Sequence, residues 1–200
     1  MRIIKKMVLL IVGIGVVVLN SCDTNLVNDE VADKDSSVSR SVYYTKYKRV
    51  DSFKSGDFIY LRCEGTLDGF RWLNGLTANN DVNLASYRGD NNTGTKWLVI
   101  DGPDEGTFVF QTQGNIPGNT YLDGYTPISD VGLAPYFGGY YSGTVWKAIT
   151  LPDGQFAFYC MGDKAGDRYL NGGTPNGIVG LAPYYGGYYS GAVWSIWVEK

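Results

Sequence analysis

Apolar residues alternate with other residues in three short segments that recur about every 48 positions along the chain. The alternating positions are Ile59, Leu61 and Cys63, then Phe108, Phe110 and Thr112, and then Phe156, Phe158 and Cys160. A two-residue period predicts a β-strand with one buried face. No segment after residue 50 has a convincing helical period, so the pattern predicts an all-β domain.

The tryptophans define the same repeat more sharply. Trp97, Trp146 and Trp194 are 49 and 48 residues apart, and the chain read backwards from each of them repeats without a gap. The repeated positions are the aromatic-Leu-Asn/Asp-Gly motifs at 72–75, 121–124 and 169–172, then Thr77, Thr126 and Thr174, then Val82, Val131 and Val179, then the Leu-Ala pairs at 84–85, 133–134 and 181–182, and last Gly94, Gly143 and Gly191. Agreement at fixed offsets over three copies indicates a triplicated unit.

Each copy predicts four short strands separated by turns. The first strand is the alternating segment, the second holds the aromatic-Leu-Asn/Asp-Gly motif, the third reads V-x-L-A, and the fourth begins at the tryptophan. The copies cover about residues 55–102, 103–152 and 153–200, within a domain that covers residues 51–200. The tryptophans and the paired leucines are expected to pack in the core and under the hairpins.

Three four-stranded units of this length resemble the β-trefoil family. Its members are closed six-stranded barrels capped by three hairpins, with pseudo-threefold symmetry. The motif YLDGxT…VGLAP…SGTVW is similar to the repeats of trefoil lectins (ricin-B-like) and of fascin-like trefoils. A propeller also uses four-stranded units, but three blades are too few for one, and solenoid repeats are shorter and more regular. The resemblance therefore implies a β-trefoil with three pseudo-symmetric repeats.

The N-terminus carries an export signal. Arg2, Lys5 and Lys6 precede an apolar run from Met7 to Leu19, and Cys22 follows shortly after. A basic start, a short apolar run and small residues describe a signal peptide, and 13 residues are too few for a membrane span, which needs roughly 20. Leu19-Asn20-Ser21-Cys22 resembles the bacterial lipobox. The resemblance implies that residues 1–21 are removed, that Cys22 is lipidated, and that the protein is anchored in the cell envelope, at the outer membrane or cell surface.

The charge of the exported chain excludes some partners. Residues 1–21 hold three of the 17 Lys and Arg. The rest of the chain therefore has 14 Lys and Arg and 20 Asp and Glu, a net charge of about −6. A nucleic-acid partner would need a basic face. Residues 22–50 are polar without a period and predict a flexible tether, with 41–50 as its most ordered part. Contact with a membrane is therefore expected through acyl chains on Cys22 alone.

The composition offers little catalytic chemistry. The chain has no His, which removes Ser-His-Asp and Cys-His nucleophiles and His-based metal sites. The acidic residues, Asp163 and Asp167 among them, are expected to be solvated in turns, and the stretches 79–81 and 90–92 lack the spacing of a calcium loop. We therefore expect no enzymatic activity, no metal and no cofactor.

Cys63 and Cys160 occupy equivalent positions in copies one and three. An exported protein permits a disulfide between them. The alternative is two buried thiols, because equivalent barrel positions can lie too far apart for a bridge.

A tyrosine-rich loop exceeds what folding requires. Residues 135–143 read PYFGGYYSG and residues 183–191 read PYYGGYYSG, whereas copy one has SYRGDNNTG at 86–94. Tyrosine combines an apolar ring face with a hydroxyl, and exposed clusters of it are usual in recognition surfaces. The rings absent from copy one are candidate ligand contacts: Phe137, Tyr140, Tyr141, Tyr185, Tyr188 and Tyr189. Tyr136 and Tyr184 are expected to fold inward, because copy one keeps Tyr87 at that position.

Asn74, Asp123 and Asn171 are equivalent, and we expect turn hydrogen bonds from their side chains to the backbone. Trefoil lectins of the ricin type also use an early-turn aspartate, which makes Asp123 and Asn171 candidate ligand residues by resemblance. The Q-x-W signature of that family is T-x-W or A-x-W here, with Thr95, Thr144 and Ala192, so the ricin-type pocket and its galactose preference are not carried over.

Two principal functions remain open after these exclusions. The first is carbohydrate binding by a lectin-like trefoil on a lipoprotein, with glycans or glycoconjugates as partners. The second is a protein-binding module, either an adhesion trefoil or a protease inhibitor; an inhibitor is expected to present one protruding loop that is not repeated. An ancillary envelope domain without a small ligand is a third possibility. Fold resemblance alone does not decide among them.

Overall fold

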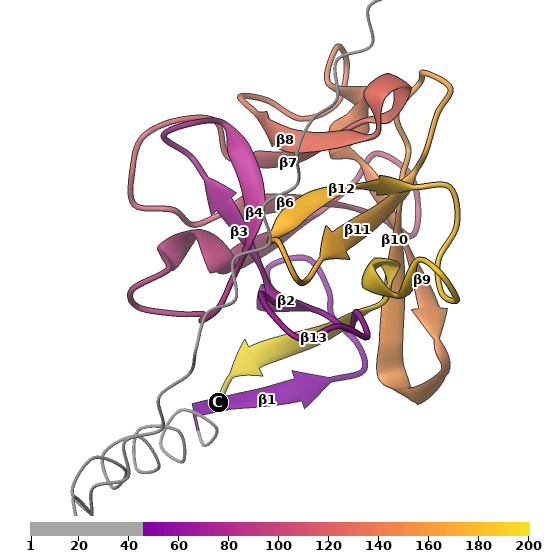
Figure 1. Cartoon of the computed structure of the whole chain (residues 1–200). Coiled ribbons are helices and arrows are strands. Elements are labelled where there is room, and N and C mark those ends of the chain that lie inside the picture. Colours follow the sequence, from indigo (N-terminus) through magenta and orange to yellow (C-terminus); the bar gives the residue numbers. More distant parts are fainter. Residues whose placement is uncertain (1–45) are drawn as a thin grey trace, which may run out of the picture.

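The computed structural model describes residues 46–200, which form one body of short strands (Figure 1). The expected signal peptide 1–21, the lipidated Cys22 and the tether as far as residue 45 lie outside the described residues. Within 46–200, no helix has the length and apolar character needed to cross a membrane.

Each repeat contributes four strands, as the pattern of apolar residues predicts. Copy one forms β2 (Phe58–Cys63), β3 (Trp72–Leu76), β4 (Asp81–Ala85) and β5 (Trp97–Asp101); copy two forms β6 (Thr107–Thr112), β7 (Tyr121–Tyr125), β8 (Asp130–Ala134) and β9 (Trp146–Leu151); copy three forms β10 (Gln155–Cys160), β11 (Tyr169–Gly173), β12 (Ile178–Ala182) and β13 (Trp194–Glu199). Short 3-10 turns precede the last strand of each repeat: η1 (Thr93–Thr95), η3 (Ser142–Thr144) and η5 (Ser190–Ala192). Two more, η2 (Thr126–Ile128) and η4 (Pro152–Gly154), occur in the connections.

The first and last strands of the repeats close into a barrel. β2 pairs with β5, β5 with β6, β6 with β9, β9 with β10, β10 with β13, and β13 with β2, all antiparallel. The middle strands form the hairpins β3–β4, β7–β8 and β11–β12, and β4, β8 and β12 pair with one another. A six-stranded barrel with three hairpins is the β-trefoil architecture, so the fold predicted from the repeat is confirmed.

The repeated tryptophans join each hairpin to the barrel. Trp97, Trp146 and Trp194 are fully buried. Each indole N–H donates a hydrogen bond to the carbonyl of the leucine 24 residues earlier, at 3.0 Å for Leu73, 3.0 Å for Leu122 and 2.9 Å for Leu170. The indole thus fills the core and satisfies a backbone acceptor that burial would otherwise leave unpaired.

A threonine of each hairpin forms a hydrogen bond to a loop of the next repeat. The Thr77 hydroxyl donates to the carbonyl of Ile116, Thr126 to Lys164, and Thr174 to Leu67. The last of these bonds returns from copy three to copy one and closes the threefold arrangement. Every hairpin therefore stands beside a loop of another repeat, which is where the candidate site forms.

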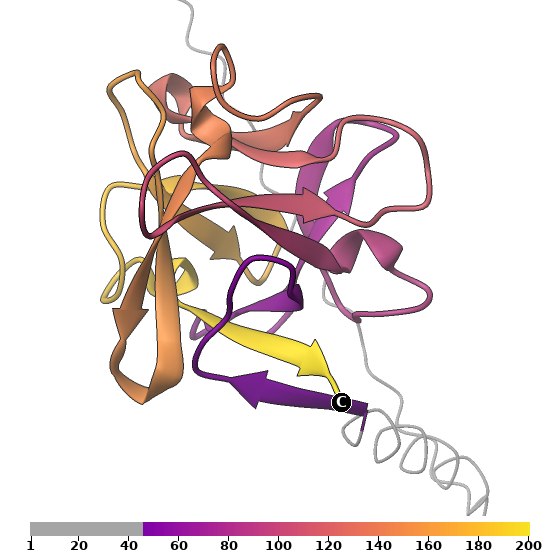
Figure 2. The ribbon, with the colours of Figure 1, turned by 180° about the vertical axis from the view of Figure 1, so that it is seen from behind.

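One further strand precedes the repeats. β1 (Tyr47–Val50) pairs antiparallel with β13 and lies ahead of residue 51, the start of the domain expected from the sequence. Figure 2, the view from behind, also shows β1 beside the C-terminal strand β13. The chain therefore enters and leaves the domain at one end.

The two cysteines are separate free thiols, so the disulfide considered from the sequence is absent. The Cys63 sulfur lies against the carbonyls of Gly172 and Gly191, and the Cys160 sulfur against those of Gly124 and Gly143. Because the repeats are related by threefold symmetry, Cys63 lies under the hairpin β11–β12 and Cys160 under the hairpin β7–β8. Burial raises the pKa of Cys63 and raises that of Cys160 to about 11, which keeps both thiols neutral.

Candidate functional site

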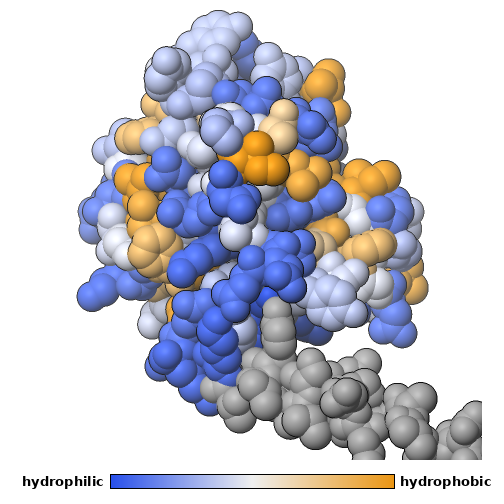
Figure 3. Space-filling model, turned by 90° about the vertical axis from the view of Figure 1, so that its left-hand side faces the viewer, coloured by the Kyte–Doolittle hydropathy of each residue, from blue (hydrophilic) through white to orange (hydrophobic). Residues whose placement is uncertain are grey.

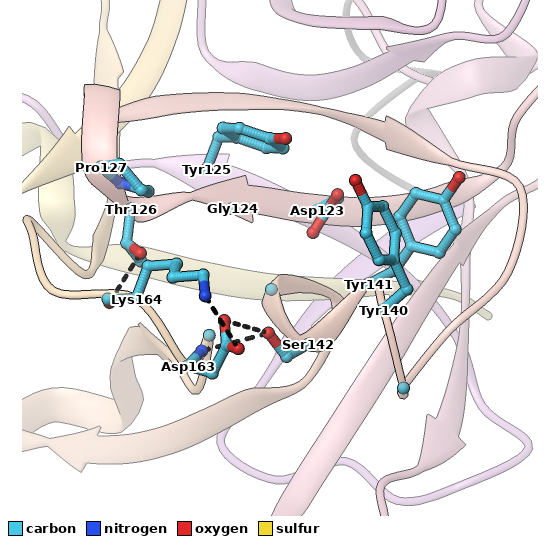
Figure 4. A pocket seen from close by; sticks show the side chains of 13 residues that line it. Asp123, Gly124, Tyr125, Thr126, Pro127, Tyr140, Tyr141, Ser142, Asp163 and Lys164 are labelled. Carbon is cyan, nitrogen blue, oxygen red and sulfur yellow. Dashed lines mark hydrogen bonds and ion pairs between the residues drawn. The ribbon is translucent and has the colours of Figure 1, made fainter.

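A cavity of about 330 Å³ opens between the second hairpin and a loop of copy three (Figure 4). Three segments line it: residues 123–127 from β7 and η2, residues 139–143 from the tyrosine loop of copy two, and residues 162–164 from the β10–β11 connection. The volume is within the range of small-molecule sites. The cavity therefore brings together Asp123, Tyr140 and Tyr141, three of the residues singled out in the sequence.

Glycines allow the tyrosine loop to lie this close to β7. An added Cβ on Gly143 would lie 2.2 Å from the Gly124 carbonyl oxygen and 2.5 Å from Oδ1 of Asp123. Gly138 and Gly139 both adopt positive φ, a conformation that favours glycine. The Thr144 hydroxyl accepts a bond from the Gly138 N–H and donates to the Tyr141 carbonyl, which holds the loop in place.

Asp123 forms the buried part of the cavity wall. The residue is 9% exposed, and its carboxylate has no hydrogen-bond partner among residues 46–200. Removal from water disfavours the charged form and raises the pKa of Asp123 to about 6. The predicted bond from this side chain to the backbone does not form, and the equivalent Asn74 donates instead to the Asn83 side chain. Asp123 is therefore a desolvated acceptor on the wall of the cavity.

A charged pair forms the opposite wall. Ser142 and Asp163 exchange two hydrogen bonds, from the Ser142 hydroxyl to the carboxylate at 3.0 Å and from the Asp163 N–H to the hydroxyl at 3.1 Å. The Lys164 amine lies 3.6 Å from the same carboxylate. The bond from Ser142, aided by Lys164, lowers the pKa of Asp163 and keeps it ionised. The sequence alone suggested only solvated turn residues here, because nothing local pairs this loop with copy two.

The exposed rings come in matched pairs. Tyr140 is 90% exposed and meets Tyr141 edge to face, with the ring centroids 5.2 Å apart. Tyr188, 88% exposed, meets Tyr189 in the same way at the same distance. Packing does not account for leaving two large rings almost fully in water, since each forgoes the burial that usually stabilises such a side chain.

Phe137 and Tyr185 have a different environment from the other candidates. Phe137 packs on Tyr121 with centroids 5.3 Å apart, and Tyr185 packs on Tyr169 at 5.2 Å. Copy one has Arg88 at this position, and its guanidinium lies 4.0 Å from the Trp72 ring centre. All three copies thus place a side chain that holds the loop against its own hairpin, and Phe137 lies outside the cavity lining.

The expectation that Tyr136 and Tyr184 fold inward is wrong. Tyr136 is 71% exposed, and Tyr184 and Tyr87 are exposed as well. The adjacent residue of each loop points back toward the hairpin instead, and the core beneath is already filled by the tryptophans and leucines. A position shared by three copies therefore marks a common loop shape and not a buried ring.

Among residues 46–200, no three His, Cys, Asp or Glu side chains are grouped so that they could hold a metal ion. What the cavity offers is a buried acceptor, two ring faces and an exposed hydroxyl–carboxylate–amine wall, a set suited to binding a polar ligand.

Comparisons with known proteins agree on the fold. No protein-family model and no curated protein sequence matches the chain. Among solved structures, SeviL bound to asialo-GM1 saccharide is 12% identical, with a TM-score of 0.52, covering 72% of this chain and 97% of that one. A designed threefold-symmetric protein, ThreeFoil, is 19% identical, with a TM-score of 0.53 and 70% and 96% coverage.

A larger enzyme contains a similar structure. It is a GlcNAcα1-4Gal-releasing endo-β-galactosidase from Clostridium perfringens, 15% identical with a TM-score of 0.54. The match covers 76% of this chain and 34% of that one, so the chain spans about a third of the enzyme's length. At these identities the likeness establishes the β-trefoil fold and no activity.

Proposed function

We propose that this domain binds carbohydrate without catalysis, through the cavity formed by Asp123, Tyr140 and Tyr141. The observation that carries the proposal is the pairing of a desolvated, unpartnered carboxylate with the exposed ring of Tyr140 and the half-buried ring of Tyr141 in one cavity. A sugar supplies what each of them lacks. Its hydroxyls donate to the carboxylate in charge-assisted hydrogen bonds, and the CH face of its ring covers an aromatic face.

The opposite wall adds polar contacts at the rim of the cavity. Ser142 and Lys164 present a hydroxyl and an amine beside the Asp163 carboxylate. Such groups accept from and donate to further hydroxyls of an oligosaccharide. The solved structures of similar fold support the proposal, because one contains asialo-GM1 saccharide and another, a Polyporus squamosus lectin, contains Neu5Acα2-6Galβ1-4GlcNAc.

The protein-binding alternative has less support from the face of the domain drawn in Figure 3. Figure 3 shows that one face of the domain carries separate hydrophobic patches divided by hydrophilic side chains. A standard protein interface buries about 800 Å² per partner, with an apolar centre and a polar rim. The repetition of the ring pair in copies two and three also favours a small repeated ligand over one protruding inhibitory loop.

The lipoprotein signal supplies the setting of this proposed function. Cleavage before Cys22 and acylation of that cysteine would attach the domain to the bacterial envelope through residues 22–45. A metabolic label of a radioactive fatty acid tests it: we expect the label on the native chain and none on a Cys22→Ala variant. Equal labelling of both would exclude lipidation at Cys22.

A glycan array tests the binding function. The probe is the chain from residue 22 with Cys22→Ser, applied at pH 7.5 to a printed array of neutral and acidic glycans. We expect binding to one class of glycan, lost in a variant with Tyr140, Tyr141, Tyr188 and Tyr189 changed to Ala. Tyr87→Ala is the matched control, because Tyr87 is an exposed tyrosine in the loop that lacks a ring pair. No binding to any glycan, together with capture of a defined protein partner, would favour the protein-binding alternative.

A further inference from the structure

The loops of copies two and three present the same rings beside different polar groups. Asp123 in copy two is Asn171 in copy three, and the two side chains lie in the same way against Gly143 and Gly191. The loop that faces each ring pair also differs in its polar side chains. Ser142 bonds to Asp163, whereas the Ser190 hydroxyl accepts a hydrogen bond from the Thr66 N–H and shares another with the Thr66 hydroxyl. Leu67 follows Thr66 where Lys164 follows Asp163.

Three charged positions of the copy-two site are uncharged at the equivalent place in copy three. Asp123, Asp163 and Lys164 become Asn171, Thr66 and Leu67. The ring pair is kept with the same geometry, at 5.2 Å and 85° in both copies. The three-residue 3-10 turn that carries the serine is also kept. The ring pair and the turn are therefore duplicated, whereas the charges at these three positions are lost and the lining Tyr125 is replaced by Gly173.

We propose that copies two and three form two carbohydrate sites, of which only the copy-two site weakens on acidification, so that the domain changes from two-site to one-site binding. The proposal rests on the proposed function and adds to it a second site and its regulation. Its structural basis is the carboxylate of Asp123 in one site and the amide of Asn171 in the other. A carboxylate gains or loses a charge with pH, and an amide does neither.

Asp123 is the group around the copy-two cavity that titrates between pH 7.5 and 5. The charged and titratable groups facing it are Asp163 and Lys164 from the β10–β11 loop, Cys160 from β10, and Tyr125, Tyr140 and Tyr141 from its own repeat. Asp163 has a lowered pKa and stays ionised, and Cys160 stays protonated. Burial places the pKa of Asp123 at about 6, inside this window.

Protonation of Asp123 changes its role in binding. The ionised carboxylate is a pure acceptor, able to take two sugar hydroxyls in charge-assisted bonds, whereas the acid keeps one donor and loses the charge. With a pKa of about 6, the ionised fraction falls about tenfold from pH 7.5 to pH 5. Apparent affinity scales with the competent fraction, so the copy-two site weakens by about tenfold.

Loss of one of two sites weakens binding to a glycan-coated surface more than it weakens binding to a free glycan in solution. Two sites on one domain engage a dense glycan surface with an avidity well above either single affinity. Acidification to pH 5 should therefore increase the rate at which the wild-type chain dissociates from such a surface by more than the weakening of the copy-two site alone would. Acidification would act as a release signal for one contact while the other persists.

Single-site variants on the printed glycan array test the proposal. Tyr188→Ala with Tyr189→Ala leaves only the copy-two site, and Tyr140→Ala with Tyr141→Ala leaves only the copy-three site. Concentration series at pH 7.5 and 5 yield an apparent Kd for each. We expect about a tenfold weakening at pH 5 for the copy-two site and a change below twofold for the copy-three site. Asn171→Asp in the copy-three-only variant should introduce the pH dependence, and Asp123→Asn in the copy-two-only variant should remove it.

The outcomes separate the two proposals. Absence of binding by the wild-type chain at pH 7.5 overturns the proposed function. Glycan binding by the wild-type chain, with equal affinity of the copy-two site at both pH values, overturns the pH-dependent valence and leaves the function standing. Absence of binding by the copy-three-only variant at pH 7.5, with circular dichroism equal to that of the wild type, also overturns the two-site proposal alone.

Discussion

The Asp123 carboxylate lies against the backbone of Gly143, where a Cβ would come within 2.5 Å of Oδ1. The same Cβ would lie 2.2 Å from the carbonyl oxygen of Gly124, which cannot move without disturbing β7. Asn74 and Asn171 have the same relation to Gly94 and Gly191. The repeated glycine of each copy is thus required for loop and hairpin to meet.

Gly143→Ala should therefore destabilise the domain. We expect a loss of about 2–3 kcal/mol in the free energy of unfolding, because overpacking against backbone has no side-chain relief. Chemical denaturation measures it. Gly106→Ala is the control, since it has a positive φ but open space around it, and should cost about 1 kcal/mol. Equal losses for the two variants would contradict the contact argument.

Asp123→Asn should stabilise the domain at neutral pH. The pKa of Asp123 is higher in the folded chain, at about 6, than the ordinary value of 3.8 for an aspartate, so the native state binds more protons between these values. Stability contributed by this group is therefore greatest at low pH and falls as pH rises toward 6.

The full shift corresponds to about 3 kcal/mol, and water at the cavity mouth screens part of it. We expect the asparagine variant to be about 1–2 kcal/mol more stable than the wild type at pH 7.5 and equal to it near pH 3.5. Denaturation curves at the two pH values provide the measurement. A variant that is less stable at pH 7.5 would show that Asp123 holds the fold together.

Trp146→Phe should destabilise the domain by about 2–4 kcal/mol. The phenyl ring leaves a cavity in the core, and the Leu122 carbonyl loses its 3.0 Å hydrogen bond from the indole. Trp197→Phe provides the control, because Trp197 is only partly buried and bonds to the Ser195 side chain. Thermal melting of both variants checks the difference, and similar melting points would refute the role of the buried indole bond.

Tyr140→Ala should separate binding from stability. The ring is almost fully exposed, so its removal should change the free energy of unfolding by less than about 0.5 kcal/mol. Glycan binding at the copy-two site should weaken about tenfold, a magnitude usual for a central aromatic contact. Titration calorimetry with the best glycan from the array measures the change in the Tyr188→Ala, Tyr189→Ala background. An unchanged Kd would remove Tyr140 from the site.

The cysteines should be unreactive in the folded protein. Both are fully buried, so a reagent cannot reach them. Burial also raises their pKa values, so the reactive thiolate does not form. A thiol reagent should label neither cysteine of the Cys22→Ser chain under native conditions and both in denaturant. A melting temperature unaffected by reductant would agree with free thiols, whereas a lowered one would reveal a disulfide.

The sequence by itself determined the repeat, the strand order within it and the trefoil fold. A two-residue apolar period reports which strand face is buried, and a tryptophan recurring every 48 or 49 residues reports three equivalent packing positions. These are local signals, and Trp97, Trp146 and Trp194 occupy equivalent positions with the same indole hydrogen bond because of them. The pattern also located the two tyrosine loops, since composition is visible without coordinates.

Only the tertiary structure decided which of these residues form a site. Threefold closure brings Asp163 and Lys164 to the cavity of copy two, about 40 residues after Asp123, and no periodicity encodes that approach. Ring direction depends on backbone φ at glycines and on contact with the hairpin, so Phe137 packs against Tyr121 of the hairpin and Tyr136 points into solvent. Desolvation of Asp123 and separation of the two thiols likewise follow from the threefold packing, because burial and distance are properties of the assembled barrel and not of its segments.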